Sequence, residues 1–258
     1  MLLAVDVGNS QTHLGAFEGE TLRSEWRLDT DRSAAPEALA ESVAAYLEDA
    51  GLDPAGFDAL ALSTVVPSLA PAYGQVASEL FGAEYLEVDP VALAGPAGVE
   101  LAVTEPDALG ADRFVNAVAC LEIFGGPCAS VDFGTSTNFD VVDAERRYLG
   151  GAIGPGVELS LDGLLRGAAR LPEVELEGPG PAIGTDTVGA IRSGFGYGFA
   201  GLVDGLNGRI AAELGTRPRF VATGGLAPLI APLCETIDEV DPHLTLTGLR
   251  ILHGVASA

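Results

Sequence analysis

Two short acidic turns are the residues of this chain best suited to chemistry. Asp6-Val7-Gly8-Asn9-Ser10 follows the apolar run Leu2–Val5. Asp132-Phe133-Gly134-Thr135-Ser136 follows a second apolar run, Cys128–Val131. The carboxylate of an Asp-x-Gly turn can hold a divalent cation, and the glycine lets backbone N–H groups face an anion. One such turn is usually an ordinary strand end, but its recurrence beside a hydroxyl predicts two loops that grip a polyphosphate.

A further cluster, Gly110-Ala111-Asp112-Arg113, stands at the start of a predicted helix. The positive end of the helix dipole favours a carboxylate in the first turn. On these residues alone the alternative stays open, namely an aspartate that only stabilises the helix start beside a solvated arginine.

The basic residues narrow the chemistry further, because all 13 of them are arginine. A Walker-type phosphate loop, a pyridoxal Schiff base and the strand lysine of protein kinases each need a lysine amine, so these sites are excluded. With a net charge of −24, the surface repels phosphate backbones, and we expect no nucleic-acid partner. A small anionic substrate would need local help from metal ions, helix N-termini or single arginines.

The same order of elements is predicted around both acidic turns. Strands are expected at Leu2–Val5, Leu14–Phe17 and Thr21–Leu28, and again at Cys128–Val131, Phe139–Val142 and Tyr148–Ile153. Asp132 follows Asp6 by 126 residues, close to half of the 258-residue chain. A duplicated domain would produce this separation.

Helices follow each set of strands. Helical periodicity is expected over Pro36–Ala50, Ser68–Leu80, Ala111–Phe124, Val157–Arg170 and Val188–Leu214, with further strands at Ala59–Leu62 and Arg219–Ala222. In the first helix Leu39, Val43 and Leu47 share one face, Ser33 is a candidate cap and Gly51 a stop signal. Leu171–Gly184, rich in Pro, Gly and Glu, should be a loop or flap.

These patterns predict an α/β protein of two lobes with a cleft between them. We place the boundary along the helix at Ala111–Phe124, which gives an N-terminal lobe of residues 1–115 and a C-terminal lobe of residues 116–258. The paired acidic turns are expected to face each other across the cleft.

Compartment and assembly rest on weaker signals. Cys120, Cys128 and Cys234 include no Cys-x-x-Cys pair, so buried free thiols are expected. The start of the chain lacks the features of a secretory signal, and the apolar stretch Ser193–Val203 is too short to cross a bilayer. A cytoplasmic protein without a membrane span is therefore expected.

The glycines of Ser193–Val203 would suit either a tight internal helix contact or a dimer interface.

Five motifs together resemble type III pantothenate kinases, in order and in spacing, over nearly the whole chain. They are Asp6–Ser10, Gly110–Arg113, Asp132–Thr135, Gly150–Gly156 and Thr223-Gly224-Gly225-Leu226. That family belongs to the superfamily of acetate and sugar kinases, heat-shock chaperones and actin. The resemblance implies a fold of two duplicated actin-like (ribonuclease H-like) lobes.

The resemblance also implies an activity and its partners. The family phosphorylates the hydroxyl of pantothenate with ATP, as the first step of coenzyme A biosynthesis. It acts as a homodimer, with Mg²⁺ or another divalent cation and with K⁺ or NH₄⁺. In-line phosphoryl transfer is the expected mechanism.

Residue roles are carried over from the family by position. The ATP phosphates would be wrapped by Asp6, Val7, Gly8, Asn9, Ser10, Gln11, Thr12 and His13, with Asp6 on Mg²⁺. Asp112 matches the general base, flanked at the pantothenate site by Gly110, Ala111 and Arg113. Arg113 is the natural candidate to meet the substrate carboxylate, because its planar guanidinium is suited to bidentate pairing. Asp132 matches the K⁺ ligand. ATP contacts are implied for Gly134, Thr135, Gly224 and Gly225, and a pantothenate contact for Thr187.

Two alternatives remain open. The family often has a tyrosine, assigned to pantothenate, where this chain has Val103, so a kinase for another small hydroxylated substrate is a second hypothesis. A non-catalytic regulatory or accessory protein of the same fold is a third. The retention of Asp6, Asp112 and Asp132 argues against it, because a protein without catalysis gains nothing from three convergent carboxylates.

Overall fold

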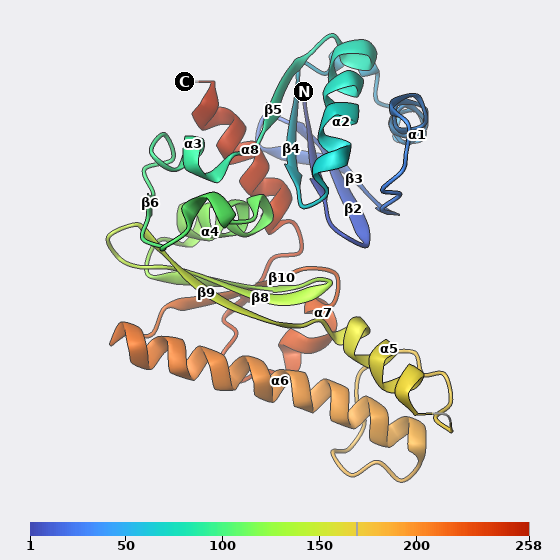
Figure 1. Ribbon diagram of the computed structural model, residues 1–258, viewed down its shortest axis with the longest axis vertical. Coiled ribbons are helices and arrows are strands. Elements are labelled where there is room, and N and C mark those ends of the chain that lie inside the picture. Colours follow the sequence, from blue (N-terminus) through green and yellow to red (C-terminus); the bar gives the residue numbers. More distant parts are fainter. Residues whose placement is uncertain (169, 258) are drawn as a thin grey trace. The chain divides into compact units, whose positions relative to one another are not determined.

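A computed structural model describes residues 1–168 and 170–257 of the chain (Figure 1). Two compact units divide it: Met1–Ala119 together with Thr245–Ala258, and Cys120–Leu244. The division falls within the helix Ala111–Phe124. The units differ from the predicted lobes in two respects, since the first unit continues to Ala119 instead of residue 115 and the last helix groups with it.

The first unit is built on a sheet with the strand order β3-β2-β1-β4-β5. Its strands are β1 (Leu2–Val7), β2 (Gln11–Glu18), β3 (Thr21–Asp29), β4 (Ala59–Thr64) and β5 (Glu84–Glu87). The chain runs antiparallel from β1 to β2 and from β2 to β3, whereas β4 pairs parallel with β1 and β5 parallel with β4. Buried residues of β1 and β4 alternate toward helices on one face and form the core of this unit.

The second unit repeats this topology. Its strands β7 (Cys128–Phe133), β8 (Ser136–Val142), β9 (Arg147–Pro155), β10 (Arg219–Thr223) and β11 (Glu239–Val240) lie in the order β9-β8-β7-β10-β11. The β7–β8 and β8–β9 pairs are antiparallel, and the β7–β10 and β10–β11 pairs are parallel. Because order and direction match strand by strand, the predicted duplication is confirmed.

Helices of the first unit lie on both faces of its sheet (Figure 1). α1 (Pro36–Asp49) and α2 (Ala70–Val76) pack on one face, and α8 (Leu244–Ala256) packs on the other. The unit also holds α3 (Pro90–Ala94), the two-residue strand β6 (Glu100–Leu101) and the first part of α4 (Ala111–Phe124). α2 continues into a wider π-helical turn, Ala77–Phe81. Therefore the single helix expected at Ser68–Leu80 is irregular.

The details of α1 show what its sequence specified. Leu39, Val43 and Leu47 are all buried, as the periodicity predicts. Gly51 has a φ of +68°, the left-handed conformation that ends many helices. The expected cap is wrong: the N-cap position is Ala35, and the hydroxyl of Ser33 instead donates to Asp31 Oδ1 at 2.7 Å.

The second unit carries α5 (Val157–Gly167), α6 (Thr187–Leu214) and α7 (Ala227–Ile230). The helix expected at Val157–Arg170 thus ends at Gly167, and Ala169 lies outside the described residues. Residues 171–184 form neither helix nor strand, in agreement with the predicted loop. Hydrogen bonds from Ser193 Oγ to Ala182 O, 2.6 Å, and from Tyr197 Oη to Gly180 O, 3.0 Å, attach this loop to α6.

Two of the three cysteines are buried, as expected. Cys120 and Cys128 are buried free thiols, and Cys234 is a half-buried one. A hydrogen bond to Cys128, together with burial, raises the pKa of Cys120, which keeps its thiol protonated. Within residues 1–168 and 170–257, none of the helices has the length and apolar character needed to cross a membrane.

Candidate functional site

The first acidic turn forms the tight connection between β1 and β2. Asp6 is the penultimate residue of β1 and is half-buried. Gly8 N donates to Gln11 O at 2.9 Å, which closes the turn and leaves Asn9 and Ser10 exposed at its tip. A carboxylate at the base of an exposed turn is the arrangement expected of a loop that meets a metal-bound phosphate.

Other predicted members of this loop lie beneath it. Val7, Thr12 and His13 are buried within β1 and β2. His13 Nε2 lies 2.6 Å from Glu25 Oε2 on the neighbouring strand β3. Side chains buried in this way support the loop from the sheet, while Asn9, Ser10 and Gln11 are exposed and can meet a ligand directly.

A buried polar chain fixes the turn from below. The hydroxyls of Thr12 and Thr30 lie 2.9 Å apart, and Thr30 Oγ1 donates to Gly8 O at 2.9 Å. Thr30 N donates to Ser10 O, also at 2.9 Å. The hydroxyl of Tyr73 also bonds to Thr12, and burial raises the pKa of Tyr73 to about 12, so the phenol stays protonated. Local sequence patterns do not identify Thr30 and Tyr73, because only the pairing of β2 with β3 and the packing of α2 bring them here.

The second acidic turn has the equivalent position in the second unit. Asp132 is the penultimate residue of β7 and is half-buried, and Gly134 N donates to Ser136 O at 3.0 Å. Thr135 is exposed at the tip. Each unit therefore presents one carboxylate and one exposed turn at the same point of its sheet. That the two turns face each other stays a prediction.

Gly224 brings a second loop against Asp132. Its φ of +91° favours glycine, and a Cβ there would lie 2.4 Å from Asp132 Oδ1 and 2.7 Å from the Phe133 backbone. The Leu226 N–H donates to Phe133 O at 3.3 Å. The structure therefore brings together Asp132, Gly134, Thr135, Gly224 and Gly225, which belong to separate motifs in the sequence.

Asp112 lies in the first turn of α4. Its Oδ1 accepts the backbone N–H of Arg113 at 2.9 Å. A Cβ on Gly110 would lie 2.6 Å from this oxygen, so only glycine allows the carboxylate to fold back over the helix start. Burial raises the pKa of Asp112, while the N–H and the positive charge of Arg113 act in the opposite direction. The result is a half-buried carboxylate with an increased affinity for protons.

A cavity of about 640 Å³ borders this helix start within the first unit. Gly110 and Ala111 form part of its wall, but so do the acidic residues Glu87, Asp89 and Asp107. Three carboxylates make the cavity unsuitable for a carboxylate ligand. Of the cluster Gly110–Arg113, the half-buried Arg113 is therefore the group that can meet such a ligand.

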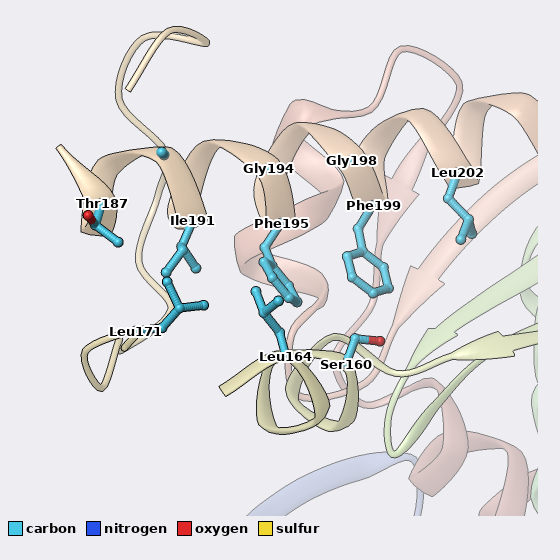
Figure 2. Close-up of a pocket in the computed structure, with 11 residues that line it drawn as sticks. Ser160, Leu164, Leu171, Thr187, Ile191, Gly194, Phe195, Gly198, Phe199 and Leu202 are labelled. Carbon is cyan, nitrogen blue, oxygen red and sulfur yellow. The ribbon is translucent and has the colours of Figure 1, made fainter. Parts of the chain in front are cut away.

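Thr187 is the first residue of α6, in the second unit. Figure 2 shows it at one end of an apolar groove between α5 and α6. The groove has a volume of about 670 Å³ and is lined by Ser160, Leu164, Leu171, Thr187, Ala190, Ile191, Gly194, Phe195, Gly198, Phe199 and Leu202. Leu164 is 40% exposed beside the exposed backbone of Gly194 and Gly198.

The available donor atoms limit how a metal could bind. The described part of the chain holds no group of three or more His, Cys, Asp or Glu side chains placed to bind one ion. Mg²⁺ that accompanies a nucleotide needs less, because it keeps several waters and binds through one or two carboxylates plus the phosphates. Asp6 at the base of the first turn fits this requirement.

Two comparisons with known sequences point to the same family. The sequence profile of the type III pantothenate kinase family matches residues 2–209. A type III pantothenate kinase of Anaeromyxobacter sp. (strain Fw109-5) is 48% identical over 253 residues, 98% of either chain.

Solved structures extend the comparison to the fold. A Campylobacter jejuni protein described as a Baf family transcriptional activator matches with a TM-score of 0.59 and 18% identity, over 99% of this chain and 98% of that one. The inorganic polyphosphate/ATP-glucomannokinase of Arthrobacter sp. strain KM matches with a TM-score of 0.51 and 14% identity, over the same shares. Likeness at such low identity supports the two-lobe, actin-like fold and nothing more specific.

Proposed function

This chain belongs to the type III pantothenate kinase family, and we propose that Asp112 is the general base of its reaction. The enzyme transfers the γ-phosphoryl group of ATP to the hydroxyl of pantothenate, the first step of coenzyme A biosynthesis. Full-length similarity to kinases does not favour the two alternatives, a regulatory protein or a kinase for another alcohol. The carrying observation is the half-buried carboxylate at the start of α4, whose proton affinity is raised.

The proton transfer can be assigned to one oxygen of Asp112. Because Oδ1 already accepts the Arg113 N–H, we expect Oδ2 to accept the proton of the substrate hydroxyl. The hydroxyl oxygen then bonds to the γ-phosphorus, and the bond to the bridging oxygen breaks so that ADP leaves with its electron pair. A base with a raised pKa takes the proton more completely than an ordinary aspartate does.

ATP is assigned to the two acidic turns. The exposed turn of Asn9 and Ser10 would meet the phosphates, and Asp6 would hold the divalent cation. A bound Mg²⁺ neutralises charge on the phosphate oxygens. In the second unit, Thr135 with Gly134, Gly224 and Gly225 would contact the nucleotide. These roles are supported by the matching positions of the two turns at the ends of β1 and β7.

A monovalent cation, K⁺ or NH₄⁺, is proposed at Asp132. The support is that the loop at Gly224 approaches the half-buried carboxylate closely, since an added Cβ there would lie 2.4 Å from Asp132 Oδ1, and a carboxylate oxygen is a ligand that hard cations accept. Activity should rise with K⁺ or NH₄⁺ in the native enzyme. In Asp132→Asn this dependence should weaken, and an unchanged K⁺ dependence would remove the assignment.

Pantothenate is assigned to Arg113 and Thr187. Arg113 would pair with the substrate carboxylate, since the neighbouring acidic cavity repels it. Gly110 and Ala111 would approach through their backbone. Thr187 would contact the same substrate from the start of α6.

The apolar groove along α6 supports a homodimer. Its walls are almost entirely apolar, and Gly194 and Gly198 present bare backbone to a partner helix. Gly196, by contrast, packs on Pro179 within the chain, so the internal contact applies to this glycine, and the dimer interface is proposed for Gly194 and Gly198. We propose that a second copy of this chain covers the groove. A cytoplasmic location is proposed with it and would be checked by cell fractionation.

The test of the function is ADP release from purified protein with ATP, Mg²⁺ and pantothenate. We expect pantothenate-dependent release that falls about 10²- to 10⁴-fold in Asp112→Asn. Asp49→Asn is the matched control, because it makes the same chemical change on an exposed position of α1. If Asp112→Asn is as fast as the native enzyme, the base assignment is wrong while the family stands.

A further inference from the structure

The first acidic turn is held from its exposed side by Arg32, which follows β3. Arg32 Nη2 donates to Asn9 O at 3.2 Å and to Asn9 Oδ1 at 3.0 Å. The guanidinium therefore grips both the backbone and the side chain of one residue at the tip of the turn. None of the motifs that revealed the family includes Arg32.

The segment that carries Arg32 is itself fixed. Thr30, two residues earlier, bonds to Gly8 and Ser10 on either side of Asn9. Asp31 Oδ1 accepts from both the N–H and the hydroxyl of Ser33 at 2.9 and 2.7 Å, which closes a turn around Arg32. Thr30 and Arg32 thus clasp the loop over three consecutive residues.

This contact has a chemical consequence for Asn9. A guanidinium only donates hydrogen bonds, so it selects the oxygen of the Asn9 amide and leaves the Nδ2 group oriented away from it. Nδ2 then offers two donors at the exposed tip of the turn, where a phosphate oxygen would accept them. Arg32 also places a positive charge beside this tip in a chain of net charge −24 that has no lysine.

We propose that Arg32 is a positioning residue for ATP, which acts by fixing the amide of Asn9 so that its Nδ2 donates to the phosphates. The proposal rests on the assignment of this turn to ATP. It identifies a residue outside the five motifs as a determinant of nucleotide affinity.

The first test separates ATP affinity from other effects. Arg32→Met keeps the length of the side chain but removes its donors, and Arg32→Lys restores a charged donor. In Arg32→Met we expect the KM for ATP to rise about tenfold, the equivalent of about 1.4 kcal/mol, with the KM for pantothenate and the Tm unchanged. Arg32→Lys should recover most of the loss. Arg23→Met is the control, since Arg23 is also exposed on the same stretch of chain but pairs with Glu18.

The second test asks whether Arg32 acts through Asn9. In a double-mutant cycle, Arg32→Met should add almost nothing to the KM for ATP once Asn9→Ala is present. Additive effects, or an unchanged KM for ATP in Arg32→Met, would overturn the proposal. Asp6→Asn distinguishes failure of the Arg32 proposal from failure of the assignment of the turn to ATP. If Asp6→Asn abolishes activity while Arg32→Met has no effect, only the role of Arg32 fails. If Asp6→Asn is fully active, the assignment of the turn to ATP fails as well.

Discussion

Asp112 experiences two opposing influences within one helical turn. Burial favours its neutral form, whereas the Arg113 N–H and guanidinium favour the charged form. Burial has the larger effect, so the pKa of this carboxyl lies above the ordinary aspartate value of about 3.9. A catalytic base gains from that balance, and the folded protein is destabilised by it.

The pH dependence of the enzyme should report this balance. Only the deprotonated carboxylate can act as a base, so kcat/KM should fall on the acid side with a midpoint above about pH 4. The pH profile of the native enzyme provides the measurement. A profile that stays flat below pH 4 would show that no group with a raised pKa limits the rate.

Stability should move in the opposite direction from activity. The pKa of Asp112 is higher in the folded than in the unfolded chain, so the folded state binds the proton more tightly and loses stability as pH rises through that window. Asp112→Asn removes this loss. We therefore expect its Tm to exceed the native value at pH 7 and to approach it at low pH. Thermal unfolding of both proteins across this pH range is the measurement.

At the scale of elements, local patterns were enough where one face of a segment is buried. The repeat of Leu39, Val43 and Leu47 correctly predicted α1, and the strand–turn–strand pattern predicted both three-stranded meanders. α8 was not predicted, although it carries buried leucines such as Leu249 and Leu252. Short edge strands such as β5 and β11 give too few residues for a period to be recognised.

The residues of the candidate site fall into two similar groups, those that a local sequence pattern reveals and those that it does not. Motifs with a fixed local spacing, such as Asp6-x-Gly8 and Gly110–Arg113, could be found from the sequence. Thr30, Arg32 and Tyr73 could not, because they reach the first turn through strand pairing and helix packing, which a local pattern does not encode. Ser33 is the converse case. Its residue type predicted a helix cap, but its hydroxyl donates to Asp31 Oδ1 instead.

The packing of α8 gives a test at this scale. A Cβ on Gly248 would lie 2.6 Å from the backbone oxygen of Val115 and 3.1 Å from Ala119 Cβ, so α8 and α4 are in close contact there. Gly248→Ala should lower the free energy of unfolding by about 1–3 kcal/mol through overpacking. Gly254→Ala, on the same helix with nothing within 4 Å, should raise it by up to about 1 kcal/mol. Denaturant unfolding of both variants decides; equal stabilities would contradict the close contact.

For the whole molecule, the duplicated topology explains why one chain offers two similar turns. Each sheet places its acidic turn at the junction of the first two strands of its meander, and each first strand pairs in parallel with a later one. The copies have since diverged in use. The first turn is clasped by Thr30 and Arg32, whereas Gly224 approaches the second.

Assembly of two copies is the prediction at this scale. Gly198 lines the groove of the second unit, and a Cβ added to it would have nothing within 4 Å, so Gly198→Glu should not disturb the single chain. If a second copy covers the groove, the buried charge should shift the protein from dimer to monomer. Gly208→Glu is the matched control, because it is equally open on α6 but does not line the groove. Light scattering after size exclusion measures both. A native monomer, or a Gly198→Glu dimer, would contradict the proposal.

The grouping of α8 with the first unit has a consequence for biosynthesis. Residues Met1–Ala119 are synthesised first. However, α8, which packs against Val115 and Ala119, is synthesised only after the entire second unit. Until residues 245–257 leave the ribosome, the side of the first sheet that α8 covers stays exposed. The second unit, Cys120–Leu244, can already fold around its own core. We therefore expect the first unit, although it is synthesised first, to complete its fold after the second. During that interval, chaperones that recognise exposed apolar surface should bind to it.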